Sequence, residues 1–374
     1  MKSTFSQNFL RNYTVPELKE QIIALGYPAF RAQQLFQAIY SDKMRPLSEI
    51  AALPADLRGL LADKFALPAL TLATTRHSED GTIKFLFKLA DGKLVESVLI
   101  PSEMLTDEGD PKRQTICVST QVGCPLGCKF CATASLKVKR NLETAEIVEQ
   151  LLSVRSFSGK KISNLVFMGM GEPMLNYDNV MRSVEIFTSP EADLLSPRRI
   201  TLSTAGVIPG IIRMANENCP IKLAISLHAT TQELRLKLMP IAKKYPLNEL
   251  LAAAEYYYRA TRKTVTFEYI LFDGLNDSEN DARRLAKISR RFRSKINVIP
   301  FHNIEFTHPE GLSAELHPAT PEKFNRFITQ LKNFGAVVMT RSSSGKDIEA
   351  ACGQLALSSA PVFSAGKGGI KAAD

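Results

Sequence analysis

The sequence lacks the segments that would export a protein or anchor it in a membrane. Its first residues, MKSTFSQNFLRN, contain no apolar stretch like that of a secretory leader, and no run of about 18 uncharged apolar residues occurs anywhere. Tryptophan and internal repeats are absent, and a composition with 45% hydrophobic residues is not fibrous, collagen-like or disordered. We therefore expect a globular, cytoplasmic protein with no membrane partner.

Charge is a weaker guide to function. The 374 residues include 47 basic and 38 acidic side chains, a formal net charge of +9, which is compatible with a polyanionic partner. Basic residues gather at 137–140, 197–199 and 290–293 and at Arg341, where they could contact phosphates. Each segment alone is more typical of a solvated surface, so charge permits an RNA partner without identifying one.

The first part of the chain predicts two small units. Residues 1–75 resemble a helical accessory domain, with a helix start at 14–17 and helical apolar spacing at 30–40. No chemistry is visible in this unit, which makes it the better candidate for docking structured RNA. Residues 76–114 form a predicted β-hairpin extension, because alternating runs flank the turn signal Asp91-Gly92.

From residue 115 onward the pattern predicts alternating strands and helices. Helical stretches separate seven strand-like runs: TICVS, NLVFM, RITLS, KLAISL, TVTFEYI, KINVIP and AVVMT. We expect an α/β fold with a partial (β/α)6 TIM-like barrel over 115–345, and the alternative is a doubly wound open sheet. In both folds ligands bind at the carboxyl ends of the strands. Residues 346–357 are a separate segment with Cys352, and 358–374 a flexible tail.

Three of the six cysteines predict a metal centre. Cys124, Cys128 and Cys131 lie close together in the chain, beside Gly123 and Gly127, and form a set of soft-metal ligands. A zinc ribbon would need a second CxxC pair, which the sequence lacks. Three ligands leave one iron of a cubane cluster open, and the CxxxCxxC spacing resembles that of radical S-adenosylmethionine (SAM) enzymes. There the open iron of a 4Fe-4S cluster binds SAM.

The other three cysteines have no such pattern. Cys117 precedes the cluster loop, Cys352 lies far away near the end of the chain, and Cys219 precedes a proline. Taken singly, each is more typical of a small buried apolar residue than of a reactive thiol.

Five motifs in order extend the resemblance along the chain from about residue 30 to residue 355: CVSTQVGCPLGCKFC, GMGEPMLN, LSTAG, SLHA and DIEAACGQL. Together they resemble the RlmN/Cfr family of radical SAM RNA adenine methyltransferases. Pro173 and the pair Ile299-Pro300 look closer to the C2-methylating branch than to the C8-methylating branch. The resemblance implies methylation at C2 of an adenosine in 23S rRNA near the peptidyl transferase centre, and of the adenosine 3′ to the tRNA anticodon. The alternatives are C8 methylation and a non-catalytic, metal-stabilised RNA-binding module.

The resemblance also implies roles for the cysteines. Cys124, Cys128 and Cys131 would hold one 4Fe-4S cluster, and each turnover would use two SAM molecules and an electron donor such as flavodoxin. Cys352 would carry the methyl group that becomes attached to the adenine. Cys117 would release the methylated base by attacking the Cys352 sulfur, which leaves a transient disulfide.

Glu96 is the candidate general base. A period of two places it on the same strand face as Leu94, Val98 and Ile100, and we expect burial there to raise its pKa toward the working pH. The family pattern before Ile100-Pro101 agrees with this role. The alternative is a charge that protects an edge strand from aggregation.

The remaining candidates suit a SAM pocket. GMGEPM is not a Rossmann fingerprint, because Met174 replaces its third glycine. Gly169 and Gly171 would let the backbone approach the cofactor at a strand end. By resemblance, Gly171 and Glu172 meet the SAM amino group, and a set at strand ends meets its ribose, carboxylate and adenine: Ser203, Ser226, Leu227 and His228. After Ile299-Pro300 the aligned ligand is His302, and Asn303 is its rival.

Overall fold

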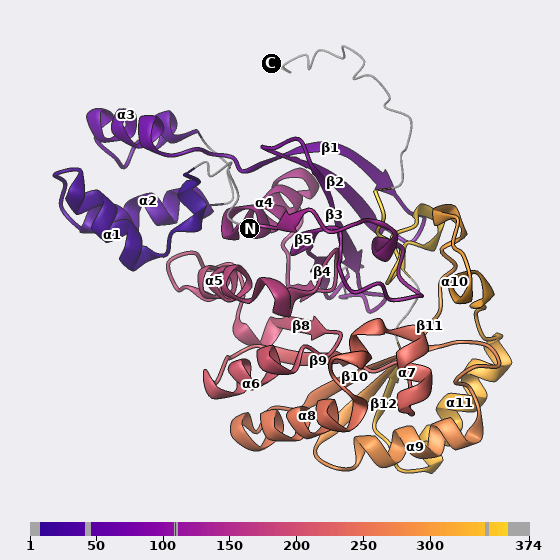
Figure 1. Ribbon diagram of the computed structural model, residues 1–374. Helices are drawn as coiled ribbons and strands as arrows, with labels where there is room; N and C mark the ends of the chain where they lie inside the picture. Colours follow the sequence, from indigo (N-terminus) through magenta and orange to yellow (C-terminus); the bar gives the residue numbers. More distant parts are fainter. Residues whose placement is uncertain (1–7, 42–45, 108, 110, 341–343, 358–374) are drawn as a thin grey trace.

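The structure is a computed structural model that describes residues 8–41, 46–107, 109, 111–340 and 344–357. Its main feature is a ten-stranded sheet whose strands follow the order β1-β2-β3-β4-β7-β8-β9-β10-β11-β12 (Figure 1). The predicted tail at 358–374 and Arg341 lie outside the described residues. None of the helices in the described ranges is long and apolar enough to cross a membrane.

The second part of this sheet is parallel and confirms the predicted βα pattern. Its strands coincide with the seven predicted runs: β4 (Gln114–Cys117), β7 (Asn164–Phe167), β8 (Ile200–Thr204), β9 (Lys222–Ser226), β10 (Val265–Leu271), β11 (Ser294–Pro300) and β12 (Val338–Thr340). They follow one another in chain order, whereas the order of a doubly wound sheet reverses at a switch point. The fold is therefore the expected partial barrel.

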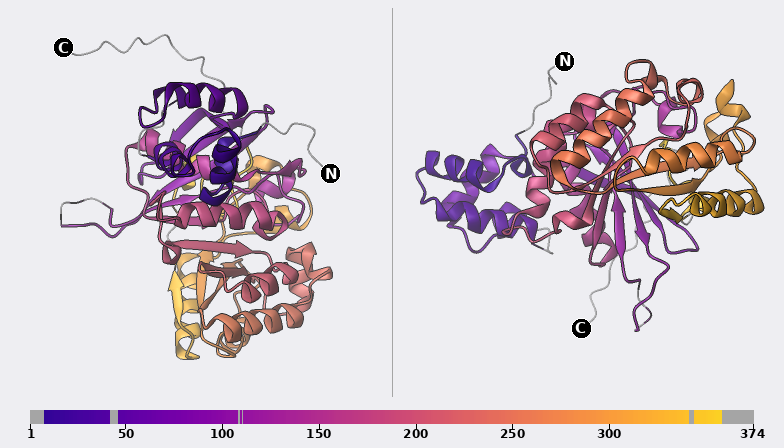
Figure 2. Two further views of the ribbon diagram at one scale, coloured as in Figure 1. Left: turned by 90° about the vertical axis from the view of Figure 1, so that its left-hand side faces the viewer. Right: turned by 90° about the horizontal axis from the view of Figure 1, so that it is seen from below.

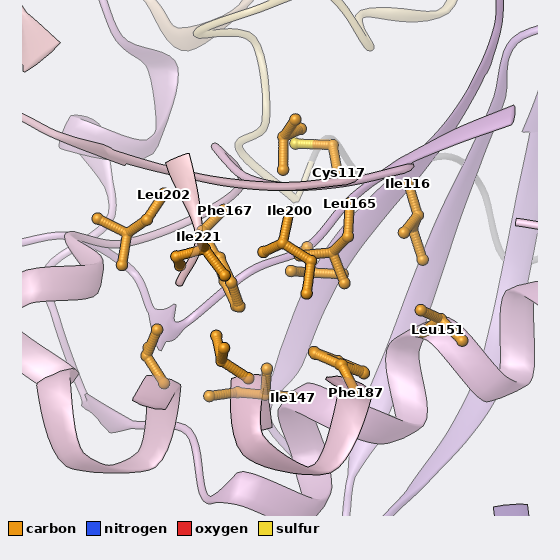
Figure 3. Close-up of a cluster of buried hydrophobic side chains, with 14 of the residues drawn as sticks. Ile116, Cys117, Ile147, Leu151, Leu165, Phe167, Phe187, Ile200, Leu202 and Ile221 are labelled. Atoms are coloured by element: carbon orange, nitrogen blue, oxygen red, sulfur yellow. The ribbon is translucent and has the colours of Figure 1, made fainter. Parts of the chain in front are cut away.

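Helices cover the outer face of the parallel strands (Figure 2). They are α4 (Thr144–Ser158), α5 (Tyr177–Thr188), α6 (Ile208–Asn216), α8 (Leu247–Thr261), α9 (Glu279–Ser289) and α11 (Pro321–Asn333). The short helices α7 (Gln232–Leu238) and α10 (Leu312–Glu315) instead pack at the carboxyl ends of the strands. Figure 3 shows Ile116 and Leu165 packed against Ile147 and Phe187 of this layer, while the Cys117 side chain lies on the other side of the strands. The inner face of the parallel strands, which carries Cys117, is not covered by this helical layer.

Three antiparallel strands continue the sheet: β1 (Leu70–His77), β2 (Ile83–Leu89) and β3 (Leu94–Pro101). The predicted hairpin around Asp91-Gly92 is confirmed, with Lys88 opposite Leu94. Because β3 also pairs with β4, the extension belongs to the main sheet, and β3 is an internal strand. The edge-strand explanation of Glu96 is therefore wrong.

The predicted N-terminal helices are present as α1 (Val15–Ala24), α2 (Phe30–Tyr40) and α3 (Ala55–Lys64). Thr14 and Glu17 form a capping box that begins α1. This unit lies beside the barrel (Figure 1) and is joined to α4 by a buried ion pair between Arg11 and Glu149, with a nitrogen–oxygen distance of 2.8 Å.

Candidate active site

The loop with the three clustered cysteines follows β5 (Gln121–Val122), which pairs with β6 (Arg140–Asn141). Gly123 begins the loop with a φ of 76°, and a Cβ there would lie 2.7 Å from the carbonyl oxygen of Lys137. Only glycine fits this combination of conformation and contact. At the other end of the loop, the Lys129 amide donates to the Leu238 carbonyl at 2.9 Å, which ties the loop to the end of α7.

The three thiols fit a cluster better than a single ion. Burial raises the pKa of Cys124 to about 12 and those of Cys128 and Cys131 above their ordinary value. The charge of Cys131 also raises the pKa of Cys124 and of Cys128, and the charge of Cys352 raises that of Cys131. They therefore face one desolvated space, where bound iron would supply the positive charge that thiolates need. Within the described ranges no three metal-binding side chains converge tightly enough for one ion. A cubane binds its three cysteines through three different irons, so its ligands need not converge on one point.

An apolar shell surrounds the loop at the carboxyl ends of the strands. Cys128 and Cys131 pack against a group of buried residues: Phe130, Ala205, Ala229, Leu238, Met239, Ile270, Phe272, Ile299, Phe301 and Leu316. Such a shell limits solvent access and so tunes a metal centre.

Arg235 anchors the strand ends beneath this shell and was missed in the sequence. Its guanidinium donates to the carbonyls of Ser226, Leu227 and Ala205 at 2.6–3.0 Å. Burial lowers its pKa to about 10. A signal existed, because helical spacing places this arginine on the same face as Leu238 and Met239.

Glu96 is buried on the inner face of β3, with 2% of its side chain exposed, and pairs with the buried Lys84 of β2. Their charged atoms lie 3.3 Å apart, and the Lys84 ammonium also donates to the Glu349 carbonyl at 3.1 Å. Burial lowers the pKa of Lys84. Sequence reasoning missed this partner, although the register of the predicted hairpin places Lys84 and Glu96 on one face.

Cys117 shares the inner face with Glu96, because it is directly opposite Val98 in the β3–β4 register. The segment that contains Cys352 bonds to Glu96 and to the cluster loop. The Leu357 amide donates to the Glu96 carboxylate at 3.2 Å, and the Ala132 amide donates to the Gly353 carbonyl at 2.6 Å. The fold therefore brings the segment that contains Cys352 to both Glu96 and the cluster loop.

Gly171 and Glu172 follow β7 and are positioned by Gln121, which was not predicted. Gly171 has a φ of 98°, and a Cβ there would lie 2.6 Å from the Gln121 side chain, whose amide oxygen accepts from the Glu172 amide at 2.9 Å. Burial raises the pKa of Glu172, whose carboxylate accepts from the Ala205 amide at 2.7 Å. Gly169 is packed against the main chain of Val118, so close packing within the protein already requires a glycine there.

The four predicted pocket residues at strand ends differ in which polar groups are available to a ligand. The Ser203 and Ser226 hydroxyls lie 3.5 Å apart at the ends of β8 and β9. Leu227 is buried, and its main-chain groups already bond to Glu268 and Arg235. His228 has a φ of 55° and accepts from the Ile270 amide at 3.1 Å through Nδ1. Burial lowers its pKa to about 3, so the ring is neutral and carries its proton on Nε2.

His302 and Asn303, the two candidate SAM ligands that follow β11, differ in burial. His302 is buried, and burial lowers its pKa to about 4. The Asn303 side chain is exposed and bonds to Glu305 two residues later, and its carbonyl accepts from Gln354 at 2.9 Å. His302 is therefore the better placed of the two, and Asn303 helps to hold the Cys352 segment.

The predicted phosphate-binding segments have different surroundings. Arg140 is paired with Asp91 and Glu146, and Arg291 with Glu255. By contrast, the pKa of Lys222 is lowered, mainly by burial and also by the charges of three other cations: Lys295, Arg199 and Arg113. These four cations lie where β4, β8, β9 and β11 begin, at the opposite end of the strands from the cluster loop, so they are outside the candidate site.

Comparison with known proteins agrees with this geometry. Residues 118–286 match the model of the radical SAM superfamily. A dual-specificity RNA methyltransferase RlmN of Syntrophobacter fumaroxidans is 43% identical over 92% of this chain and 97% of its own length. The protein of the same name from Syntrophotalea carbinolica is 41% identical over 92% and 89%. The crystal structure of a radical SAM methyltransferase from Sphaerobacter thermophilus superposes with a TM-score of 0.84, at 39% identity, covering 93% of this chain and 99% of that one.

Proposed function

The chain belongs to the RlmN family of radical SAM RNA methyltransferases, and from this premise we propose that it methylates C2 of an adenosine. As a member, it uses SAM and a 4Fe-4S cluster to methylate RNA. The proposed targets are an adenosine of 23S rRNA near the peptidyl transferase centre and the adenosine 3′ to the tRNA anticodon. We further propose a cytoplasmic location and an electron donor such as flavodoxin.

One observation carries the proposal. The Cys352 segment contacts Glu96 through the Leu357 amide and the cluster loop through the Gly353 carbonyl. A base that binds between Glu96 and the cluster loop would lie beside a carboxylate, the segment that carries Cys352 and the cofactor site. Transfer of a methyl group to an unreactive ring carbon needs this combination.

We assign the cofactor sites as follows. Cys124, Cys128 and Cys131 would hold the cluster, which with SAM supplies the radical chemistry that a ring carbon without nucleophilic character requires. Gly171 and Glu172 would bind the SAM amino group. The set Ser203, Ser226, Leu227, His228 and His302 would line its ribose, carboxylate and adenine, with hydroxyl and Nε2–H groups as donors.

The reacting residues act on the substrate. Cys352 would accept the methyl group from one SAM as a thioether. Loss of one hydrogen atom from that methyl group to the radical chemistry of the cofactor site would let its carbon bond to adenine C2, and the adduct would return one electron to the same site. Glu96 accepts the proton that leaves C2, and Lys84 holds its carboxylate in place. The Cys117 thiolate would then attack the Cys352 sulfur, and the carbon–sulfur bond would break with its electron pair going to the methylene carbon, which takes up a proton and becomes the new methyl group. A Cys117–Cys352 disulfide would remain for an external thiol to reduce.

Mass spectrometry of the RNA product tests the reaction. Anaerobic incubation with isotopically labelled SAM should place the label at adenine C2 in 23S rRNA and in tRNA. A label at C8 would contradict the proposed position, and protein that binds zinc in place of iron and transfers no label would support the non-catalytic alternative.

Two cysteine variants test the thiol roles. Cys117→Ala should accumulate protein covalently bound to RNA, because the step that breaks the carbon–sulfur bond is lost. Cys352→Ala should yield neither product nor adduct. Cys219→Ala, which removes a buried thiol close to Met181, is the matched control and should turn over normally. Normal turnover by either of the first two variants would eliminate the two-thiol scheme.

A further inference from the structure

The outer surface of the cluster loop carries a hollow with a basic border. Six residues line this hollow, which has a volume of about 460 Å³: Pro125, Leu126, Pro240, Ile241, Lys243 and Lys244. We call this surface, together with the neighbouring Lys129 and Lys237, the loop face. Its centre is apolar and its border is cationic, the arrangement that is common in protein interfaces.

The loop face includes residues of the loop that carries the cysteines, and both pack on the same apolar shell. Pro125 and Leu126 lie between Cys124 and Cys128 in the chain, and a Cβ at Gly127 would lie 3.8 Å from Pro240. Leu126 and Ile241 pack on the same apolar shell as Cys128 and Cys131. A protein that rests on the loop face therefore comes close to the cluster site.

The charges of the loop face are not neutralised within the described part of the chain. Lys129, Lys237, Lys243 and Lys244 are exposed, and no carboxylate of the described residues pairs with them. Lys244 instead lies over the Tyr245 ring, 5.3 Å from its centre. Two uncompensated lysines line the apolar centre, and two more lie within three residues of its lining in the chain, which favours an acidic partner.

The position of the loop face distinguishes this partner from the RNA. The Cys352 segment bonds to the other end of the loop, at Ala132, whereas the hollow borders residues 125–127. A partner on the loop face would leave the proposed methyl-transfer pocket accessible. RNA that reaches Cys352 need not touch the loop face.

We propose that the loop face binds a small acidic one-electron carrier protein that reduces the cluster. The inference rests on the proposed function, because the radical reaction requires one electron from outside the chain. In the step itself the carrier loses one electron and the cluster gains it, and no covalent bond forms or breaks. The lysines steer the carrier, and the apolar centre receives the region around its redox group.

The test measures cluster reduction without SAM or RNA, so that activity is not the readout. The variant Lys243→Glu/Lys244→Glu, with its cluster reconstituted, is mixed anaerobically with fully reduced flavodoxin, and loss of the cluster's visible absorption is followed by stopped flow at low salt. We expect the second-order rate constant to fall roughly tenfold or more relative to the unmodified protein. Lys160→Glu/Lys161→Glu, a pair of adjacent exposed lysines after α4, is the matched control and should reduce normally.

A control with dithionite and the pattern of outcomes separate the possible failures. Reduction by dithionite should be equal in all proteins, which shows that the cluster is intact. Equal rates of cluster reduction by flavodoxin in the variant and the unmodified protein would overturn the proposal. If the variant with equal rates also bound RNA more weakly, the loop face would be assigned to RNA. A protein that incorporates no iron would overturn the proposed function itself, and this inference with it.

Discussion

At the scale of single residues, the site depends on charged and polar groups that are buried together with their partners. Glu96 is paired with Lys84, and Arg235 with three carbonyls. Each group would be costly without its partner, because a buried charge or donor loses its hydration. The partners therefore also fix the positions of the Glu96 carboxylate and of the strand ends.

The neutral state of His228 predicts a pH dependence of stability. Burial lowers its pKa to about 3, against the ordinary value of 6.5 in an unfolded chain. Between these values the unfolded state binds a proton that the folded state excludes, so the free energy of unfolding falls as the pH drops. The contribution is at most about 1.4 kcal/mol per pH unit. Urea unfolding at pH 7 and pH 5 should show a loss of roughly 2 kcal/mol from this residue.

Substitution identifies the source of that loss. His228→Gln should show a smaller difference between the two pH values than the unmodified protein, and His302, whose pKa is also lowered, contributes with the same sign. His308→Gln changes an exposed histidine and should leave the difference as it is. An unaltered pH dependence in His228→Gln would show that the ring is not held neutral.

At the scale of elements, the cluster loop is shaped by backbone contacts that only glycine permits. Gly123 has a φ of 76°, and a Cβ added there would lie 2.7 Å from the Lys137 carbonyl oxygen and 2.9 Å from that of Leu136. Any side chain must push the segment 136–137 away, and Cys124 moves with it. The position of the first ligand therefore depends on its glycine neighbour.

We expect Gly123→Ala to lose most of its iron. Anaerobic reconstitution followed by iron and sulfide analysis measures this directly. Gly26→Ala is the matched control, because Gly26 has a similar φ of 84° but nothing within 4 Å of an added Cβ. Both variants should lose roughly 1 kcal/mol of stability from the left-handed conformation. Full iron incorporation by Gly123→Ala would show that the loop tolerates the displacement.

At the scale of the whole molecule, a buried ion pair joins the N-terminal helices to the barrel. Arg11 and Glu149 are each 1% exposed, and Arg11 also donates to the Ile39 carbonyl at 2.7 Å. The Glu149 carboxylate accepts from the amides of Ala69 and Leu70, where β1 begins. One glutamate of α4 thus contacts the helical unit and the start of the sheet, and so sets the orientation of the proposed RNA-docking unit.

Removal of one partner should be severe because it leaves the other charge buried. We expect Arg11→Met to lower the free energy of unfolding by about 3–5 kcal/mol in urea titrations. Arg11→Met/Glu149→Met should recover part of this loss. Arg283→Met removes the exposed pair with Glu279 and should cost less than about 1 kcal/mol. Equal losses in Arg11→Met and Arg283→Met would contradict a structural role for the buried pair.

Much of the fold could be predicted because its signals are local. Each parallel strand coincides with a β-branched run, and the turn Asp91-Gly92 sets the hairpin register. The boundary at residue 76 could not be found in this way, because β1 begins at Leu70 and joins the sheet through pairing with β2. The internal position of β3 likewise depends on its pairing with β4, which no local pattern reveals.

The sequence by itself determined the cysteine loop, the order of strands and helices, and the family resemblance, since spacing and periodicity are properties of neighbouring residues. Only the tertiary structure decided which distant groups meet: Arg11 with Glu149, Arg235 with the Ala205 carbonyl, and the Leu357 amide with a carboxylate 261 residues away. Such contacts depend on sheet register and on how a terminal segment packs. The physical reason is that a buried polar group is stable only beside its partner, and the chain reveals that partner only when it is folded.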